Sequence, residues 1–283
     1  MYKKLFLTLL INFKLLAIPH YYVTSADANF FKQVVKLIQT IQANDKANLE
    51  RIAVFDLGFT VDQCKHLNSL ERVQVYDVEK KHPDLLKYFV TSPHGRKVRG
   101  WFAWKPVAMK QALDLFPYIL YLDSAMEVMQ PLDDLFLHIA QNGYFLIDSG
   151  DPLEQTLPYR MTNVVTNKII TKLSPSQQAM LLSTDTKIIS AGIQGLSHKY
   201  CATYSMPVYE LVSEIEIFAD DGTARLGFGQ GRHDQIIFSI YAALNGMQIN
   251  RAGWQNIVVD GKRVPLHCHW DRKLLNQYSA IKY

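Results

Sequence analysis

The chain has 283 residues, 48% of them hydrophobic, and a formal net charge of +4. A chain of this length and composition is expected to fold around a sizeable hydrophobic core. Its Lys and Arg residues are scattered and its densest basic stretch, residues 94–99, is short, which disfavours nucleic acid as a partner. Cys64, Cys201 and Cys268 are widely spaced and indicate neither a disulfide framework nor a zinc-binding motif.

The N-terminal segment combines charge and apolar character. Lys3 and Lys4 precede the apolar residues 5–13, and Lys14 then interrupts the pattern. This arrangement is typical of a secretory signal without a small-residue cleavage site, and it falls short of the ~20 apolar residues of a membrane span. We expect residues 1–19 to be a signal-like or weak anchor segment that associates the protein with the secretory pathway or a membrane. The alternatives are an N-terminal helix packed on the domain and a cytoplasmic protein.

The first half of the remaining chain alternates between strand-like and helix-like patterns. Short apolar or β-branched runs predict strands at residues 20–25, 51–55, 73–76, 118–122 and 143–147. Apolar residues at helical spacing lie between them, in residues 31–41, 109–116 and 132–140. This alternation predicts an α/β fold with a mainly parallel central sheet flanked by helices, and a ligand site at the carboxyl ends of the strands.

The second half is less regular. Residues 151–187 contain three prolines and predict a loop with short helices, while residues 188–195 resemble a strand whose glycines permit close approach of a ligand or another backbone. Residues 207–218 and 233–246 are predicted to be helices, and the tail from Gly261 is polar and rich in His. Because no repeat or Gly/Ser-rich linker divides residues 20–283, we expect a single domain there.

Polar residues follow several of the predicted strands. Thr24 and Ser25 end the first strand, and Asp56, Asp77 and Asp123 end three others. A single Asp at a strand end is more often a turn former or helix cap, but together these residues predict a polar crevice. The Gly-rich motifs of dinucleotide-binding and P-loop enzymes are absent, as are the G-X-S-X-G and H-E-X-X-H motifs, which disfavours those enzyme classes.

Several segments, taken in order, resemble one enzyme family. They are Trp104-Lys-Pro, the run from Tyr118 to Asp123-Ser-Ala-Met-Glu-Val, Pro131-Leu-Asp-Asp-Leu-Phe, Ala191-Gly-Ile-Gln-Gly, and Gly231-Arg-His-Asp-Gln-Ile-Ile-Phe-Ser. Together they resemble nucleotide-sugar glycosyltransferases with the A-type, single Rossmann-like fold, over roughly residues 20 to 270. The resemblance implies that this fold and a nucleotide-sugar donor should be found here.

The resemblance also implies a divalent cation, Mn²⁺ or Mg²⁺, at the donor diphosphate. Asp123 matches the first carboxylate of the family's Asp-X-Asp motif, but the third position is Ala125. Glu127 would share a face with Asp123 in an extended strand, or is a surface residue beyond it. His267 and His269 resemble the late His that often completes the metal site in this fold, although a late His is usually structural.

Other roles follow from the same resemblance. Asp234 and Gln235 would lie at the reacting centre, with Asp234 as base for the acceptor hydroxyl or as hydrogen-bond partner of the donor; its alternative role is a helix cap. Lys105 would meet the diphosphate or lie on the helix surface, and Thr24, Ser25 and Asp56 would hold the nucleoside. Among the tryptophans that could stack on a sugar or base (Trp101, Trp104 and Trp254), Trp101 ranks first because it adjoins the Trp-Lys-Pro motif.

The expected function is therefore the transfer of a sugar from a nucleotide-diphosphate donor, UDP-linked by preference, to a hydroxyl of a glycan, lipid or protein. One alternative is a non-catalytic glycan-binding or scaffold protein on the same fold, which Ala125 favours. Another is a sugar nucleotidyltransferase, which ranks lower because its Gly-rich, basic N-terminal phosphate loop is absent.

Overall fold

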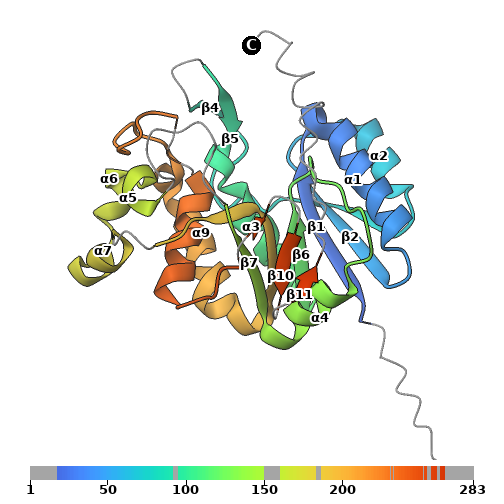
Figure 1. Ribbon diagram of the computed structural model, residues 1–283. Helices are drawn as coiled ribbons and strands as arrows, with labels where there is room; N and C mark the ends of the chain where they lie inside the picture. The colour runs from blue at the N-terminus through green and yellow to red at the C-terminus, as the bar shows by residue number, and fades with distance from the viewer. Residues whose placement is uncertain are drawn as a thin grey trace, which may run out of the picture.

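A computed structural model describes residues 18–91, 95–149, 160–182, 186–229, 231 and 233–250, together with three short strands in residues 252–264. Its centre is a six-stranded sheet with helices on both faces (Figure 1). The strands in spatial order are β3 (Val73–Asp77), β2 (Leu49–Asp56), β1 (His20–Ala26), β6 (Tyr118–Leu122), β8 (Ile189–Ser197) and β7 (Tyr144–Asp148).

The sheet is mostly parallel, as the alternating sequence pattern predicts. β1 pairs in parallel with β2 and β6, and β2 pairs in parallel with β3. The exception is β8, which runs antiparallel between β6 and β7. This reversal places residues near the start of β8 beside the end of β6, so two strands of opposite direction meet at the carboxyl edge.

Two hydrophobic layers hold the helices on the sheet. One layer packs beneath α1 (Phe31–Asn44), α2 (Val61–Asn68) and α4 (Asp133–Asn142). The other packs beneath α3 (Trp104–Leu115), α8 (Met206–Glu210) and α9 (His233–Leu244). In α1 the buried aliphatic residues recur at helical spacing, and each large aliphatic side chain that leaves water contributes ~1.5–3 kcal/mol to stability.

Local signals explain where several helices begin and end. Thr60 and Gln63 form a reciprocal capping box at the start of α2, and Ser174 and Gln177 do the same for α7 (Pro175–Leu181). Gly143 ends α4 in a left-handed conformation, with φ of 93°. The expected loop at 151–187 contains the short helices α5 (Met161–Val164), α6 (Asn167–Ile170) and α7 in its described part.

The expected helix at residues 207–218 is not continuous. It is α-helical in α8 and becomes a 3₁₀ segment over Leu211–Phe218, with a non-helical residue at Glu214 (φ −113°, ψ 62°). A β-hairpin that the sequence analysis did not anticipate, β4 (Tyr88–Val90) with β5 (Lys97–Arg99), projects beside the carboxyl edge (Figure 1). Three further short strands form a small antiparallel sheet: β9 (Ala252–Gly253), β10 (Asn256–Val259) and β11 (Lys262–Val264).

Arg99 fastens this hairpin to the end of β1. Its guanidinium Nη2 lies 3.1 Å from the Asp27 carboxylate, and the Tyr88 hydroxyl donates to the same oxygen at 2.6 Å. The Arg99 guanidinium also lies over the Tyr88 ring, 4.3 Å from its centroid. Among the described helices, none combines the length and apolar character that crossing a membrane requires; residues 1–17, which carry the predicted signal-like segment, lie outside the described part of the chain.

Candidate active site

A buried ion-pair cluster lies at the carboxyl edge of the sheet. The Lys105 ammonium, in the first turn of α3, is 3.1 Å from Asp123 Oδ1 and 3.3 Å from Asp234 Oδ2. It also donates to the Ala191 carbonyl oxygen of β8 at 3.1 Å. Lys105 and Asp234 are almost fully buried, while the Asp123 side chain keeps 27% exposure. We call these three residues the Lys105 cluster; its opening to solvent is on the Asp123 side.

The reversed strand β8 positions Asp123. Asp123 follows β6 directly, and its backbone N–H donates to the Gly192 carbonyl at 2.8 Å. A Cβ atom at Gly192 would lie only 2.8 Å from Asp123 Oδ2, so glycine leaves the space that this carboxylate fills. The Tyr121 hydroxyl donates to Asp123 Oδ1 at 3.0 Å, which fixes the carboxylate from the β6 side.

The charges of the cluster follow from burial and mutual attraction. Burial acts to lower the pKa of Lys105, but the Asp123 and Asp234 carboxylates outweigh it and the pKa is raised, so Lys105 stays an ammonium at neutral pH. Burial raises the pKa of Asp234 to about 6; Lys105 opposes the rise and Asp123 adds to it. Asp234 is therefore a carboxyl group that exchanges its proton near physiological pH.

Helix α9 brings Asp234 to the cluster and is held against β8. His233, just before Asp234, has a left-handed backbone (φ 48°), and its Nδ1 is 2.7 Å from the Phe218 carbonyl oxygen. Gln235 Nε2 donates to the Ile189 carbonyl at 2.7 Å. The predicted pair Asp234 and Gln235 thus lies at the cluster, with Gln235 bound to the strand that faces it.

Of the predicted nucleoside residues, two end the strand next to Asp123. Thr24 and Ser25 are buried near the end of β1, which neighbours β6. The pKa of Tyr121 is raised far above its ordinary value by burial and by Asp123, and Ser25 acts to lower it, which places Ser25 beside the cluster. Within the part of the chain that the structure describes, Thr24 Oγ1 has no hydrogen-bond partner.

Asp56 has a local structural role. Its Oδ1 accepts the backbone N–H groups of Gly58 and Phe59, both at 2.6 Å, so it forms the turn after β2. It also borders a pocket of about 570 Å³ between that turn and α2. No contact between Asp56 and the Lys105 cluster is present among the described residues. Its predicted role at the nucleoside stays a prediction.

Two expectations of the sequence analysis are corrected by the geometry. The chain turns after Asp123, with the Met126 N–H donating to the Asp123 carbonyl at 2.9 Å, so residues 123–127 are not an extended strand. Glu127 instead pairs with Lys36 at 2.5 Å. Lys105 does not lie on the helix surface, because the two carboxylates hold it in the interior. His267, His269 and Trp254 lie outside the described residues.

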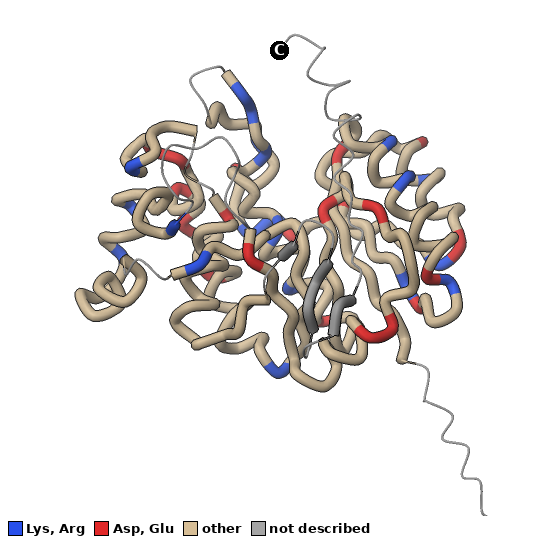
Figure 2. The backbone as a smooth tube through the Cα atoms, viewed as in Figure 1, with Lys and Arg blue, Asp and Glu red and all other residues tan. Residues whose placement is uncertain are grey.

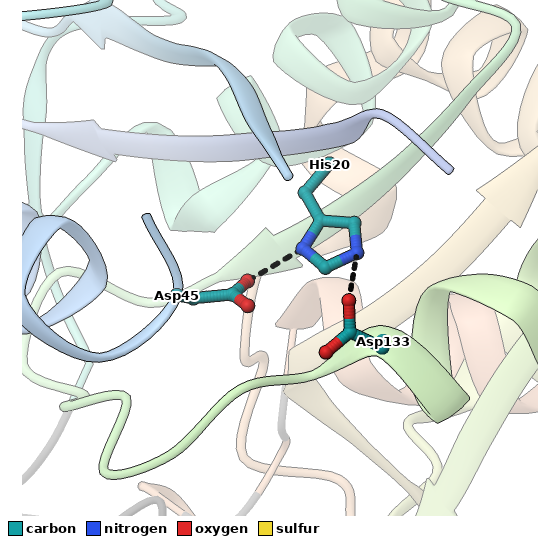
Figure 3. Close-up of side chains that lie close together, drawn as sticks. All are labelled: His20, Asp45 and Asp133. Carbon is teal, nitrogen blue, oxygen red and sulfur yellow. Dashed lines mark hydrogen bonds and ion pairs between the residues drawn. The ribbon is translucent and has the colours of Figure 1, made fainter. Parts of the chain in front are cut away.

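A second polar cluster lies at the opposite edge of the sheet (Figure 3). His20 begins β1; its Nδ1 is 2.7 Å from Asp45 Oδ2, and its Nε2 is 3.6 Å from Asp133 Oδ1. Asp45 also accepts hydrogen bonds from the Tyr22 hydroxyl and the Leu132 N–H, and the His20 ring stacks on Phe136 with centroids 4.0 Å apart.

These three side chains are the one group in the described residues with the composition and proximity of a cation site. They lie at the amino end of β1, whereas Asp123 follows the carboxyl end of the parallel strand β6. The length of β1 separates the two edges by roughly 20 Å. The His20 cluster is consequently no part of the Lys105 site, and its hydrogen bonds join β1 to the segments that precede β2 and α4.

In the rest of the described chain, residues of both charges are mixed. Figure 2 shows Lys and Arg interspersed with Asp and Glu along the backbone. Most of the ion pairs away from the two clusters involve exposed side chains, such as Lys172 with Glu214 and Lys46 with Glu71. Exposed pairs of this kind contribute little to stability. Lys105 differs from them because its ammonium is buried and contacts two carboxylates.

Comparison with known proteins defines the fold. Core-mannan synthase A of Aspergillus fumigatus, solved with Mn and GDP, matches with a TM-score of 0.51 over 79% of this chain and 69% of that chain, at 11% identity. This chain has the glycosyltransferase A-type fold. The mannosyltransferase Ktr4p of S. cerevisiae matches with a TM-score of 0.49 over 94% of this chain and 81% of that chain, at 10% identity. The galactosyltransferase LgtC, solved with donor and acceptor sugar analogs, matches with a TM-score of 0.46 over 83% and 74%, at 14% identity.

At such identities the likeness concerns the A-type fold alone. No protein-family model matches the sequence, and no curated protein matches it. The A-type assignment agrees with the mainly parallel sheet and its reversed strand β8. What the chain does must then be argued from its own residues at the carboxyl edge.

Proposed function

We propose that this protein is a glycosyltransferase that moves a sugar from a nucleotide-diphosphate donor, UDP-linked by preference, to a hydroxyl of a glycan, lipid or protein. The observation that carries the proposal is the Lys105 cluster, in which a buried ammonium joins two carboxylates at the ligand-binding edge of an A-type fold. A buried ion pair adds little net stability, because the loss of hydration offsets the attraction, and buried groups with shifted pKa values mark candidate active sites.

The cluster has the chemistry that sugar transfer needs. The partly exposed Asp123 can accept hydrogen bonds from donor hydroxyls, and its contact with the Lys105 ammonium holds that carboxylate in place. Asp234, with a pKa of about 6, can accept a proton near neutral pH, either from an acceptor hydroxyl or within a hydrogen bond to the donor sugar. Thr24 and Ser25, buried near the end of the neighbouring strand β1, are the residues that we propose hold the nucleoside.

A divalent cation fits the described residues poorly. Asp123 Oδ1 already contacts the Lys105 ammonium and the Tyr121 hydroxyl, position 125 is Ala, and Glu127 is paired with Lys36. One carboxylate is too few ligands for Mn²⁺ or Mg²⁺. The proposed cation therefore depends on His267 and His269, whose role remains a prediction, and none of the steps above is assigned to it.

The test is an assay of donor hydrolysis and transfer with UDP-glucose, UDP-galactose, UDP-N-acetylglucosamine and GDP-mannose, each with and without Mn²⁺. We expect turnover of at least one donor, and we expect Asp123→Asn to abolish it while leaving the fold intact, because Asp234 still pairs with Lys105. Asp62→Asn, which changes a carboxylate that is 96% exposed, is the matched control and should keep full activity. Full activity of Asp123→Asn would contradict the proposal.

Ala125 and the poor ligand set favour a second candidate, a non-catalytic protein that binds nucleotide sugars or glycans. Binding of a donor by calorimetry without any turnover would support this candidate over the enzyme. Formation of a nucleotide sugar from UTP and a sugar 1-phosphate would instead indicate the nucleotidyltransferase. Secretory or membrane association through residues 1–19 stays part of the proposal, to be tested by fractionating cells that express the full chain and a chain lacking these residues.

A further inference from the structure

Three aromatic rings surround the Lys105 ammonium. Its Nζ is 5.2 Å from the ring centroid of Tyr121, 5.8 Å from that of Trp104 and 5.9 Å from that of Phe102. Tyr121 is fully buried and Trp104 keeps 6% exposure, so neither can offer a ring face to a ligand. Phe102 is only partly buried. It is the ring at this ammonium that a bound molecule can reach.

The backbone at Phe102 is held in an unfavourable conformation. Gly100, Trp101 and Phe102 are all left-handed, with φ of 51°, 46° and 62°. A left-handed conformation is unfavourable for a residue with a side chain, because its Cβ crowds the following carbonyl oxygen. Gly100 is required here, because a Cβ atom would lie 1.9 Å from the Leu85 carbonyl oxygen. For Trp101 and Phe102, the contacts of each side chain indicate what the left-handed backbone positions.

Trp101 and Phe102 differ in what their rings contact. The Trp101 ring stacks on Phe89 of the hairpin, with centroids 3.7 Å apart, so it joins β4 to this segment. One face of the Trp101 ring is thus covered by Phe89, and its predicted stacking on a sugar stays a prediction. The Phe102 ring instead lies 5.7 Å from the His233 ring and 6.0 Å from the Trp104 ring, in tilted arrangements.

Phe102 and His233 come from distant parts of the sequence but share one property. Both residues have a left-handed backbone. Phe102 lies three residues before Lys105, which α3 brings to the cluster, and His233 lies directly before Asp234, which α9 brings there. Strained residues that persist near a site are commonly held for function. Here the rings of the two strained residues lie 5.7 Å apart, and the Phe102 ring is 5.9 Å from the Lys105 ammonium.

We propose that Phe102 is the platform on which the pyranose ring of the donor sugar packs, with its hydroxyls directed to Asp123. The inference rests on the proposed function and deepens it. A pyranose has an apolar face of C–H groups and an edge of hydroxyls, and a site for it pairs an aromatic surface with polar acceptors. The Lys105 ammonium has both within reach, with the Phe102 ring centroid 5.9 Å away and the partly exposed Asp123 carboxylate 3.1 Å away.

The test separates the ring of Phe102 from its backbone. Phe102→Asn removes the ring and keeps a residue that tolerates the left-handed conformation, and Phe102→Gly does the same without any side chain. Phe102→Tyr keeps the ring. Leu115→Asn, at the exposed far end of α3, is the matched control for a polar substitution on the helix that carries Lys105.

Calorimetry would measure the affinity of each variant for UDP and for the UDP-hexose that the wild type prefers. Loss of one aromatic contact is expected to weaken UDP-hexose binding about tenfold in Phe102→Asn and Phe102→Gly, and to leave UDP binding unchanged. Phe102→Tyr and Leu115→Asn should match the wild type. A merely structural role would weaken both ligands together, so equal losses for UDP and UDP-hexose, or no loss, would overturn the inference.

The two proposals fail in different ways. If the wild type turns over a donor and Phe102→Asn binds it equally well, the platform is wrong and the proposed function stands. If the wild type neither binds nor turns over any donor of the panel, the proposed function is wrong and the platform falls with it. Melting curves would show whether each variant folds. If Phe102→Asn does not fold, the affinities of Phe102→Gly for UDP and UDP-hexose decide between the outcomes.

Discussion

The Lys105 ammonium and the Asp234 carboxylate lie 3.3 Å apart although both side chains are almost completely removed from water. This pair joins the first turns of α3 and α9, two helices whose starting residues are 129 positions apart in the sequence. The two opposite charges in the interior therefore stabilise each other. Asp123 adds a second carboxylate, so loss of the Lys105 ammonium would leave two carboxylates without a cation.

Lys105→Met tests this dependence. It leaves two carboxylates without their counter-charge, and removal of one partner from a buried ion pair costs about 3–5 kcal/mol in unfolding free energy. We expect a loss of that size at pH 7.5 in urea unfolding, together with loss of transfer. Because Asp234 can take up a proton, the loss should shrink at pH 5. A cost below about 1 kcal/mol at pH 7.5 would show that the pair does not hold the two helices.

The raised pKa of Asp234 predicts a specific dependence of stability on pH. Its folded value of about 6 exceeds the unfolded value of about 3.9, so the native state binds this proton more tightly. The contribution to stability is present below pH 4 and is lost as the pH rises to about 6, with a slope of at most about 1.4 kcal/mol per pH unit. Urea unfolding of the wild type and of Asp234→Asn should differ by this slope between pH 4 and 6. Parallel curves would refute the assignment.

Gly192→Ala tests how β8 positions Asp123. The added Cβ would lie 2.8 Å from Asp123 Oδ2 and must displace that carboxylate. We expect a loss of about 1–3 kcal/mol in unfolding free energy, typical of overpacking, and a larger loss of activity than of stability. Ser190→Ala, two positions earlier on β8, is the control and should leave donor turnover unchanged. Wild-type kinetics in Gly192→Ala would show that Asp123 has no fixed position in the reaction.

The His20 cluster should affect stability and not the site. Asp45→Ala removes the acceptor of hydrogen bonds from His20, Tyr22 and Leu132, which leaves buried polar groups unsatisfied. A cost of about 2–4 kcal/mol is expected by thermal or urea unfolding. Because the cluster lies at the opposite edge of the sheet, donor affinity measured below the melting transition should be unchanged. A change in donor affinity would show that the His20 cluster influences the site at the carboxyl edge.

Periodicity predicted the sheet well because its strands are nearly continuous apolar runs that end in polar residues, as in β6 with Asp123. It did not predict the β4–β5 hairpin, whose strands have three residues each and depend on the contact of Arg99 with Asp27. Strand extension past Asp123 also failed, because the pairing of Glu127 with Lys36 of α1 is a tertiary contact.

The candidate site was predictable in its members but not in its arrangement. Asp123, Asp234 and Lys105 were each expected near a ligand, yet Lys105 was placed at a diphosphate or on the helix surface. Its position between two carboxylates depends on how α3 and α9 pack on β8, which no local pattern encodes. The contribution of Phe102 was missed for a related reason, because a left-handed phenylalanine has no signature in the sequence.

The contact of Arg99 with Asp27 also has a mechanical consequence. Arg99 holds the end of β1, its carbonyl oxygen accepts the Trp104 Nε1–H at 3.1 Å, and it directly precedes the left-handed residues Gly100 to Phe102. The same residue therefore ties the end of β1 to the backbone that carries Phe102 and to the start of α3, so loss of the Arg99 side chain would free the hairpin and the left-handed segment together.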